Sequence, residues 1–507
     1  MLCSLKSATL VGIEGVIVDT EVDVSTGLPA FNLVGLGNNA VREGGVRVRS
    51  ALGNNGFDFK SARTTVNLAP ANLRKEGSGF DLPIALAAVA SKGMAKAVRV
   101  DLLYVGELAL DGNTRAIRGT LALAEAAKRA GLSGIVVPRS NAAEAALVED
   151  IEVFGVESLV AAIEVLEGKG GSGRVYRLGG SSKSNGLPKF SRDFSEVIGQ
   201  PAARRGAEVA AAGGHNLMMI GSPGSGKTMI AQRIPSILPA LSRTEAIEST
   251  KVHSAAGTLN GYGLLTSPPF RAPHHTCSPA GLIGGGSSPR PGELSLAHNG
   301  VLFLDELPEF QKPALESLRQ PLEDEHIIVV RAKEALSFPT RSMVVAAMNP
   351  CPCGYRGSEI RTCICGDMHA RRYRGRISGP MLDRFDIFVQ VEPVDTERLL
   401  DGDVAESSAE IKARVVRARE SQRKRFEGTG ISCNAQMEGR QMKKFIRLRA
   451  ATKKLIKEFS DRHQLSSRAL HRSFQVARTI ADLAQEEEVR EDDIFLALSM
   501  QQARWAF

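Results

Sequence analysis

The 507-residue sequence contains one tryptophan, 5% aromatic residues in total and no apolar run of about 20 residues. The missing apolar run excludes a membrane-spanning helix, and the first twelve residues lack an apolar core of signal-peptide length. The seven cysteines are an odd number in a long chain, which argues against a disulfide framework. We therefore expect a cytoplasmic protein that has no membrane partner.

The net charge of +8 is unevenly distributed along the chain. The positive surplus lies beyond residue 167, because the first 167 residues carry slightly more acidic than basic side chains. A basic surplus confined to one part of a chain suits an anionic partner such as nucleic acid. Extra basic side chains that serve only solubility explain the same charge equally well.

The length predicts two or three domains, and the composition suggests where the first one ends. Residues 168–190 are rich in glycine and serine and show little apolar periodicity, so we expect a flexible linker there. Residues 1–167 alternate strand-like and helix-like runs, which predicts an α/β domain. The clearest runs are strands at 15–24 and 63–70 and helices at 80–93 and 119–131.

The pattern after the linker changes once more near residue 395. Residues 191–395 continue as an α/β region, whereas residues 396–507 have apolar residues recurring at three and four positions. We expect a central domain with a parallel sheet, followed by a small C-terminal bundle of helices.

The stretch NLMMIGSPGSGKTMIAQRI carries the sharpest chemical signal. An apolar run leads into GSPGSGKT and then into a helical pattern, which is the context that a phosphate-binding loop requires. The glycines let backbone amides surround phosphate oxygens, while Lys227 reaches the β- and γ-phosphates and the Thr228 hydroxyl binds Mg²⁺. The predicted ATP-binding residues are Gly221, Ser222, Pro223, Gly224, Ser225, Gly226, Lys227 and Thr228.

A second strand-like run, GVLFLDELPEF, ends in two acidic residues. A buried parallel strand would carry Asp305 and Glu306 to its carboxyl end, where ligands lie in such sheets. We expect Asp305 to hold Mg²⁺ through water, and Glu306 to orient and polarise the water that attacks the γ-phosphate.

Three further residues complete the predicted catalytic set. Asn349 ends the strand-like run SMVVAAMN and would contact the γ-phosphate or the attacking water. Arg384 in SGPMLDRFDIF would reach the nucleotide of a neighbouring subunit, and Arg468 in LSSRALHRSF would fold onto the phosphates of its own subunit. In this order the elements describe an AAA+ ATPase with a helical lid.

Longer strings add a family resemblance: FRAPHHTCSPAGLIGGG, PRPGELSLAHNGVLFLDELPEF, LRQPLED and SGPMLDRFDI. They are similar to the magnesium-chelatase-like AAA+ ATPases, and the whole chain resembles their ComM/YifB branch. The resemblance implies a homo-hexameric ring of the bacterial cytoplasm that uses ATP and Mg²⁺. It also implies a motor or helicase on single-stranded or branched DNA, which drives branch migration during natural transformation and homologous recombination.

The N-terminal domain of this branch resembles the catalytic domain of Lon protease, so proteolysis must be weighed. The stretch KEGSGFD places Gly79 where the nucleophilic serine of that family stands, with Ser78 out of register. The position of the Lon lysine falls at about Leu121. Both halves of a Ser–Lys pair are therefore missing, and we expect a Lon-like domain without protease activity that serves DNA contact or ring assembly.

Four of the seven cysteines lie in an insertion at residues 351–365, directly after Asn349. A C-x-C pair, a spacer and a second C-x-C pair offer four thiolates, enough to close a tetrahedral Zn²⁺ site, with His369 as a substitute ligand. Reduced free cysteines and a functional disulfide are the alternatives. The predicted ligands are Cys351, Cys353, Cys363 and Cys365.

The segment that follows, GDMHARRYRGRISG, interleaves arginines with one aromatic residue. Such a pattern suits phosphate contacts and base stacking, so we expect it to bind DNA. Pairing with acidic residues of an adjacent subunit is the alternative. The residues concerned are Arg371, Arg372, Tyr373, Arg374 and Arg376.

The roles of four further residues and one functional alternative stay open. His274, His275 and Cys277 invite a metal site, although structural or pore-loop roles are favoured, and Glu293 is expected in a loop that faces the pore or an interface. A chelatase-like or protein-remodelling ATPase that acts on a protein partner is the alternative function, although the chain has no DxSxS segment of its own.

Overall fold

The structure is a computed structural model with two compact units. It describes residues 2–35, 37–59, 61–169, 174–176, 192–259, 263–286, 289–331, 334–359, 361–394, 405–446, 448, 450–463 and 465–502. Unit 1 comprises residues 1–185, 246–265 and 330–338, and unit 2 comprises residues 186–245, 266–329 and 339–507. Most of the predicted linker, residues 170–173 and 177–190, lies outside the described residues.

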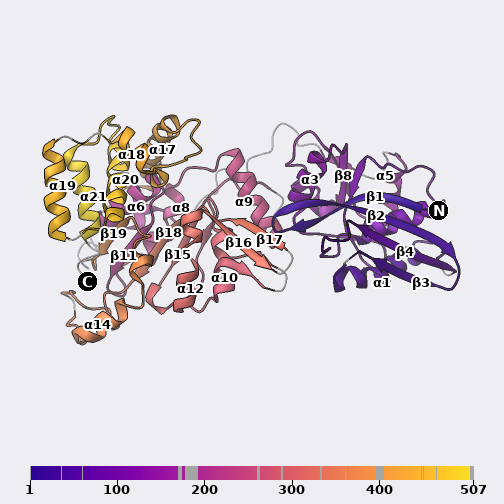
Figure 1. Cartoon of the computed structure of the whole chain (residues 1–507), viewed down its shortest axis with the longest axis horizontal. Coiled ribbons are helices and arrows are strands. Elements are labelled where there is room, and N and C mark those ends of the chain that lie inside the picture. Colours follow the sequence, from indigo (N-terminus) through magenta and orange to yellow (C-terminus); the bar gives the residue numbers. More distant parts are fainter. Residues whose placement is uncertain are drawn as a thin grey trace. The chain divides into compact units, whose positions relative to one another are not determined.

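Unit 1 is built on a mixed eight-stranded sheet in the order β10-β9-β8-β5-β1-β2-β4-β3 (Figure 1). Its strands are β1 (Leu2–Val11), β2 (Glu14–Thr26), β3 (Ala30–Val34), β4 (Ala62–Ala69), β5 (Leu102–Tyr104), β8 (Gly134–Pro138), β9 (Glu152–Val156) and β10 (Arg174–Tyr176), with a separate hairpin of β6 (Glu107–Leu108) and β7 (Thr114–Arg115). Its helices are α1 (Asn39–Asn54), α2 (Asp81–Ser91), α3 (Thr120–Arg129), α4 (Ala142–Ala145) and α5 (Leu159–Leu166).

Helices cover both faces of this sheet. Val136 of β8 packs in the core with α1, α2 and α5, whereas its neighbours Ile135 and Val137 pack in a second core with α3 and α4. Successive side chains of a strand point to opposite faces, so one strand contributes to both cores. The α/β class predicted for the first 167 residues is confirmed, and their likeness to Lon protease stays a prediction.

Unit 1 also contains two segments from far along the sequence. Part of α9 (Arg243–Ala256) belongs to it, and there Lys251 forms ion pairs with Glu14 (2.6 Å) and Glu125 (2.8 Å). Part of the hairpin of β16 (His326–Arg331) and β17 (Glu334–Pro339) belongs to it as well. The sequence alone gave no sign of these additions.

Unit 2 contains a five-stranded, all-parallel sheet in the order β12-β15-β18-β11-β19. The strands are β11 (Leu217–Gly221), β12 (Phe270–Arg271), β15 (Val301–Leu304), β18 (Met343–Met348) and β19 (Ile387–Val391), and β13 (Gly284–Gly285) pairs with β14 (Arg290–Pro291). The helices before residue 395 are α6 (Pro201–Gly213), α7 (Lys227–Ala231), α8 (Ile234–Ile237), α10 (Pro279–Ile283), α11 (Glu293–Leu296), α12 (Lys312–Ser317), α13 (Pro321–Asp324), α14 (Asp367–Arg374) and α15 (Gly379–Leu382).

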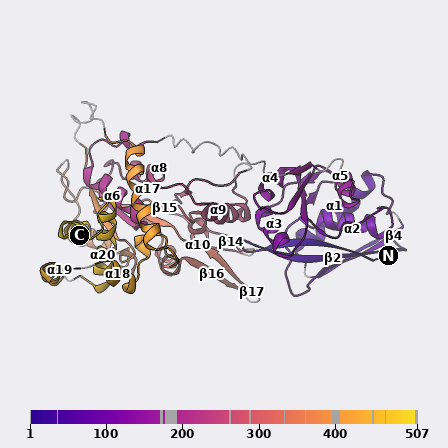
Figure 2. The same cartoon turned by 90° about the horizontal axis from the view of Figure 1, so that it is seen from above.

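The predicted C-terminal bundle of helices is confirmed. It consists of α17 (Ser408–Arg425), α18 (Gly439–Phe445), α19 (Ala450–His463), α20 (Ser467–Leu483) and α21 (Glu491–Gln502). Figure 2 shows α17 and α20 beside α6, and the three helices are in contact. Their apolar side chains share one core with the sheet, so the bundle is packed directly on the parallel sheet of unit 2.

Asp386, directly before β19, lies at this junction. It is buried and forms an ion pair with Arg472 of α20, while its Oδ2 accepts a hydrogen bond from the backbone of Asn216 (2.9 Å). Burial alone would raise the pKa of Asp386, but Arg472 and His215 lower it to about 2.

Asp386→Asn is therefore expected to lower the free energy of unfolding at pH 7 by about 2 kcal/mol. Because the pKa in the folded state lies below that of the unfolded chain, this stabilisation is present above about pH 4 and is lost as the pH falls toward 2. Urea titrations at pH 7 and pH 3 would measure it, with Asp461→Asn, at an exposed position of α19, as the control. Equal stability of wild type and Asp386→Asn at pH 7 would contradict the assignment.

No helix within the described ranges is both long and apolar enough to cross a membrane.

Candidate active site and the adjacent cysteine cluster

The predicted phosphate loop connects β11 to α7, as the sequence pattern requires. Gly224 and Gly226 have φ angles of +76° and +94°, which only glycine adopts readily, so the backbone turns sharply enough to surround an anion. The loop therefore has the local geometry that the sequence predicted.

Lys227, the first residue of α7, is buried against this loop. Its Nζ donates to the backbone oxygens of Gly221 and Ser222 (both 2.8 Å) and to the side-chain oxygen of Asn349 (3.3 Å). Burial lowers the pKa of Lys227 to about 8, against the opposing effect of the nearby carboxylates Asp305 and Glu306. The ammonium group is thus held where β- and γ-phosphates would replace the backbone oxygens as its partners.

The acidic pair meets the phosphate loop as predicted. The Thr228 hydroxyl donates to Oδ2 of Asp305 (2.7 Å), so two oxygen ligands of the kind that Mg²⁺ prefers lie together. Glu306 follows with φ +51°, and its carboxylate lies 3.3 Å from Nδ1 of His275. The residues present fit a bound nucleotide with its metal ion.

Arg384 and Arg468 meet at one carboxylate. Nη2 of Arg384 lies 2.5 Å from Oε2 of Glu323 on α13, and Arg468 pairs with the other oxygen of the same group. Arg384 is only 5% exposed, and burial lowers the pKa of its guanidinium. The sequence assigned the two arginines to different nucleotides, whereas in this structure they lie side by side.

The four predicted cysteine ligands come together. Their Sγ atoms all lie within 4.8 Å of one another, and no other described group of three or more His, Cys, Asp or Glu side chains is close enough to hold a metal. Cys351 is buried, and hydrogen bonding, chiefly from the backbone of Tyr355, lowers the pKa of the Cys353 thiol to about 6. His369 and the pair His274 and His275 do not belong to this cluster.

The arginine segment forms α14, with two exposed and one buried side chain at its centre. Arg371 and Arg372 are exposed, whereas Tyr373 is 7% exposed and packs in the core beneath the helix. The expectation that Tyr373 stacks on bases is therefore corrected, because its ring anchors α14 to the core. Arg376 pairs with Glu309 (2.7 Å), and Nε of Arg374 donates to the backbone of Ala370 (3.3 Å).

Three other positions that the sequence analysis named, Glu293, Ser78 and Leu121, have defined surroundings in the structure. Glu293 begins α11 and binds Arg271 through two contacts, at 2.6 and 2.8 Å. In unit 1, Ser78 donates to Glu107, and Leu121, at the expected lysine position, is buried. The expectation that this domain lacks a Ser–Lys pair stays a prediction.

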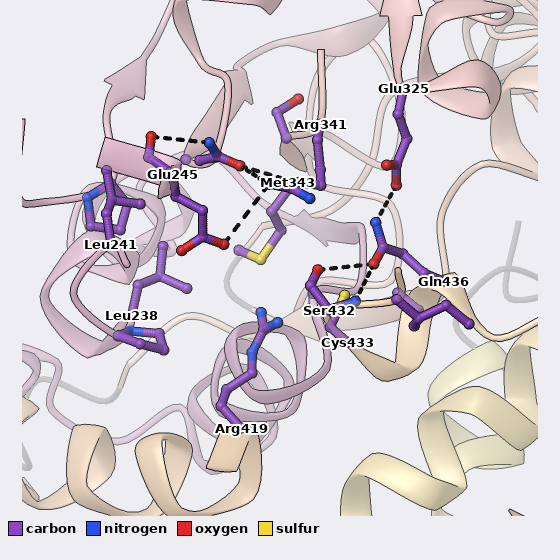
Figure 3. Close-up of a pocket in the computed structure, with 18 of the residues that line it drawn as sticks. Leu238, Leu241, Glu245, Glu325, Arg341, Met343, Arg419, Ser432, Cys433 and Gln436 are labelled. Carbon is purple, nitrogen blue, oxygen red and sulfur yellow. Dashed lines mark hydrogen bonds and ion pairs between the residues drawn. The ribbon is translucent and has the colours of Figure 1, made fainter. Parts of the chain in front are cut away.

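A separate cavity of about 430 Å³ lies at the opposite edge of the sheet in unit 2. Its lining includes Asn216, Gly300 and Met343, at the amino ends of strands whose carboxyl ends face the phosphate loop. Figure 3 shows Arg341 beside Glu245 on one side, and Gln436 between Ser432 and Glu325 on the other. None of the predicted site residues lines this cavity.

The parallel sheet, the phosphate loop on β11, the acidic pair after β15, Asn349 after β18 and the helical bundle together define the class of the protein. It is an AAA+ ATPase, and the reaction of that class uses ATP with Mg²⁺.

Comparison with known proteins gives the family. Three family models match: "Magnesium chelatase, subunit ChlI" over residues 193–399, "Subunit ChlI of Mg-chelatase" over 20–141 and "Magnesium chelatase, subunit ChlI C-terminal" over 405–501. An uncharacterized protein of Mycobacterium tuberculosis is 42% identical over 500 residues, with 98% of each chain covered. YifB of Escherichia coli is 40% identical over 502 residues, covering 98% of this chain and 96% of its own.

The competence protein ComM of Haemophilus influenzae is 39% identical over 500 residues, covering 98% of this chain and 97% of its own. The chain belongs to the ComM/YifB family of magnesium-chelatase-like AAA+ ATPases.

Sequence reasoning missed two partners of the predicted residues, His275 for Glu306 and Glu323 for the two arginines. The paired histidines of APHHTC were a visible signal, but nothing in their spacing connects them to a residue 31 positions later. Glu323 stands in LRQPLED, which contributed to the family resemblance without suggesting a role.

Proposed function

We propose that this protein is an ATP-driven, hexameric DNA motor that moves on single-stranded or branched DNA and promotes branch migration of recombination intermediates. The observation that carries the proposal is the chain segment from Asn349 to α14, which joins the nucleotide site to an exposed pair of arginines. The competence protein among its relatives supports DNA as the partner.

In this proposal, each step of ATP hydrolysis is given to a particular residue of the site. Bound ATP with Mg²⁺ supplies the phosphoryl group whose transfer to water drives the motor. Lys227 would neutralise the charge of the phosphates, and Thr228 and Asp305 would hold the Mg²⁺ ion bound to the nucleotide. Glu306 would orient the attacking water. Asn349, already in contact with Lys227, reports whether the γ-phosphate is present.

A ring would complete the site. Arg384 reaches the nucleotide of the neighbouring subunit in this proposal, which requires its release from Glu323. Arg468 binds the same carboxylate, so a rearrangement of α13 that frees one arginine frees the other as well. Nucleotide binding between subunits is thereby linked to the position of the C-terminal bundle.

Helix α14 is the proposed DNA contact. Arg371 and Arg372 are exposed, and the described part of the chain provides no ion pair for either. Arg356 pairs with Asp367 (2.7 Å), which ties the cysteine segment to the start of α14. Two exposed guanidinium groups on an anchored helix suit contacts with backbone phosphates, which need no defined base sequence.

Arg371→Ala/Arg372→Ala is expected to weaken binding of single-stranded DNA at least tenfold at 50 mM salt and to flatten its salt dependence, because two phosphate contacts are lost. Fluorescence anisotropy across a salt series measures both quantities. Arg417→Ala/Arg423→Ala, which removes two exposed arginines of α17, is the matched control. Unchanged DNA binding together with broken hexamers would show that the arginines serve a subunit interface instead.

ATP turnover with and without single-stranded and branched DNA tests the proposal as a whole. Strong stimulation by DNA, followed by strand displacement on a branched substrate, is the expected result. Turnover that is indifferent to every DNA would exclude the motor and favour a chelatase-like or remodelling ATPase that acts on a protein.

We include in this proposal a structural Zn²⁺ ion held by Cys351, Cys353, Cys363 and Cys365. Three of the Sγ–Sγ distances are 3.4, 3.6 and 3.7 Å. A tetrahedral ion with Zn–S bonds of about 2.3 Å separates its sulfur ligands by about 3.8 Å, whereas a disulfide needs about 2.05 Å. The donor set and its spacing therefore fit zinc and do not fit a disulfide.

A further inference from the structure

The turn at Cys351–Gly354 packs directly on the phosphate loop. Gly354 has φ +84°, and its backbone N–H donates to the carbonyl oxygen of Cys351 (2.9 Å), which closes a tight turn. A Cβ atom on Gly354 would lie 2.6 Å from Cγ of Pro223 and closer still to its Cδ. Pro223 stands in the phosphate loop, between Ser222 and Gly224, so the turn forms one wall of that loop.

This turn is connected to both of its neighbours. Two residues before Cys351, Asn349 accepts a hydrogen bond from Lys227 (3.3 Å). On the other side, Sγ of Cys351 and Sγ of Cys353 lie 3.7 and 3.6 Å from Sγ of Cys363. The turn is therefore placed between the nucleotide-binding lysine and the sulfur cluster.

We propose that the metal ion held by the four cysteines fixes this turn against Pro223, so that the affinity for nucleotide depends on the metal site. The inference rests on the zinc site proposed above. A turn with a left-handed glycine has many accessible conformations, and binding its C-x-C pair to Cys363 and Cys365 through one ion removes most of them. The cysteine turn then holds Pro223 in position before nucleotide binds. Less conformational entropy of the phosphate loop is lost on binding, which strengthens nucleotide affinity.

Two glycines of the same segment provide a matched pair of variants. Gly354 and Gly357 have similar φ angles, +84° and +75°, so alanine at either position meets the same backbone strain. Only at Gly354 does the added Cβ meet the phosphate loop, since a Cβ on Gly357 has nothing within 4 Å. A difference between the two variants reports the contact with Pro223 rather than the strain.

The experiment measures metal content by mass spectrometry and nucleotide affinity by equilibrium titration with a fluorescent ATP analogue. Gly354→Ala is expected to keep one zinc per chain and to bind nucleotide about tenfold more weakly, while Gly357→Ala matches wild type in both. Cys363→Ser/Cys365→Ser is expected to lose both the metal and the affinity. Cys433→Ser, which removes a cysteine outside the cluster, is the control for thiol loss.

A second arm uses the wild-type protein alone, so that it does not depend on any variant folding. A chelator removes the metal, and added Zn²⁺ is expected to restore the affinity for the ATP analogue. If the metal is lost and the nucleotide affinity is unchanged, nucleotide affinity does not depend on the metal site. The same conclusion follows if Gly354→Ala binds nucleotide as tightly as wild type. Either result would overturn the coupling but leave the zinc site itself in place. A protein that neither contains nor takes up zinc would overturn the site and the coupling together, without affecting the test of DNA-stimulated turnover.

Discussion

Glu306→Gln is expected to lower the maximal rate of ATP turnover by about 10²- to 10⁴-fold, with DNA present or absent. The amide keeps the size of the side chain but cannot accept the proton of the attacking water. Because Lys227, Thr228 and Asp305 are untouched, nucleotide affinity should stay within a few-fold of wild type. Steady-state phosphate release and equilibrium nucleotide titration measure the two quantities.

Glu309→Gln is the matched control for this change. Glu309 lies three residues further along the chain, and its carboxylate pairs with Arg376 (2.7 Å). The same substitution there should leave turnover near the wild-type rate. A Glu306→Gln protein that hydrolyses ATP normally would remove Glu306 from the reaction and send the search for the base to another residue near His275.

Arg384→Ala is expected to lower turnover by about 10³-fold, the lower end of the effect of an arginine finger. If the guanidinium reaches the nucleotide of a neighbouring subunit, the effect appears only when rings have formed. Sedimentation of the variant with ATP should therefore accompany the rate measurement. Arg319→Ala is the control, because Arg319 lies against Arg384 but its side chain pairs with Glu316 (2.7 Å).

Mixed rings distinguish action on a neighbour from action within one subunit. Lys227→Ala subunits cannot bind nucleotide productively but keep Arg384, while Arg384→Ala subunits keep a complete phosphate loop. Each variant alone should be inactive, and mixing them should restore part of the turnover. Failure of every mixture to recover activity, in rings shown to contain both variants, would mean that Arg384 serves its own subunit or the fold.

Much of the nucleotide site could be predicted because its chemistry is encoded in consecutive residues. Eight residues from Gly221 to Thr228 specify a loop whose geometry depends mainly on its own glycines. The apolar runs before Asp305 and Asn349 indicated buried parallel strands, and the carboxyl ends of such strands meet at one edge of the sheet. The contact of Thr228 with Asp305 follows from that rule.

The cysteine cluster was predictable for a similar reason. Two C-x-C pairs within fifteen residues can approach one another through local turns, so little of the remaining structure is needed to bring them together. The spacing of apolar residues also predicted the helical C-terminal region, because these residues repeat at every third and fourth position.

Only the tertiary structure decided which distant groups meet these local elements. The ring of Tyr373 is buried because the face of α14 that packs on the core includes it, a choice that the arginines around it do not reveal. Glu323 binds both Arg384 and Arg468, and Arg468 lies 145 positions after Glu323 in the chain. Gly354 lies against Pro223, which stands 131 positions earlier.

The sequence by itself thus determined the catalytic loop, the acidic pair, the thiol cluster and the class of each domain, since short-range spacing and backbone conformation control them. The tertiary structure decided the partners of those groups, since these depend on how helices pack on a shared sheet. The phosphate loop and the thiol cluster depend on residues that are close in the chain. The contact of the cysteine turn with the phosphate loop instead depends on the folding of unit 2, which brings two distant segments together.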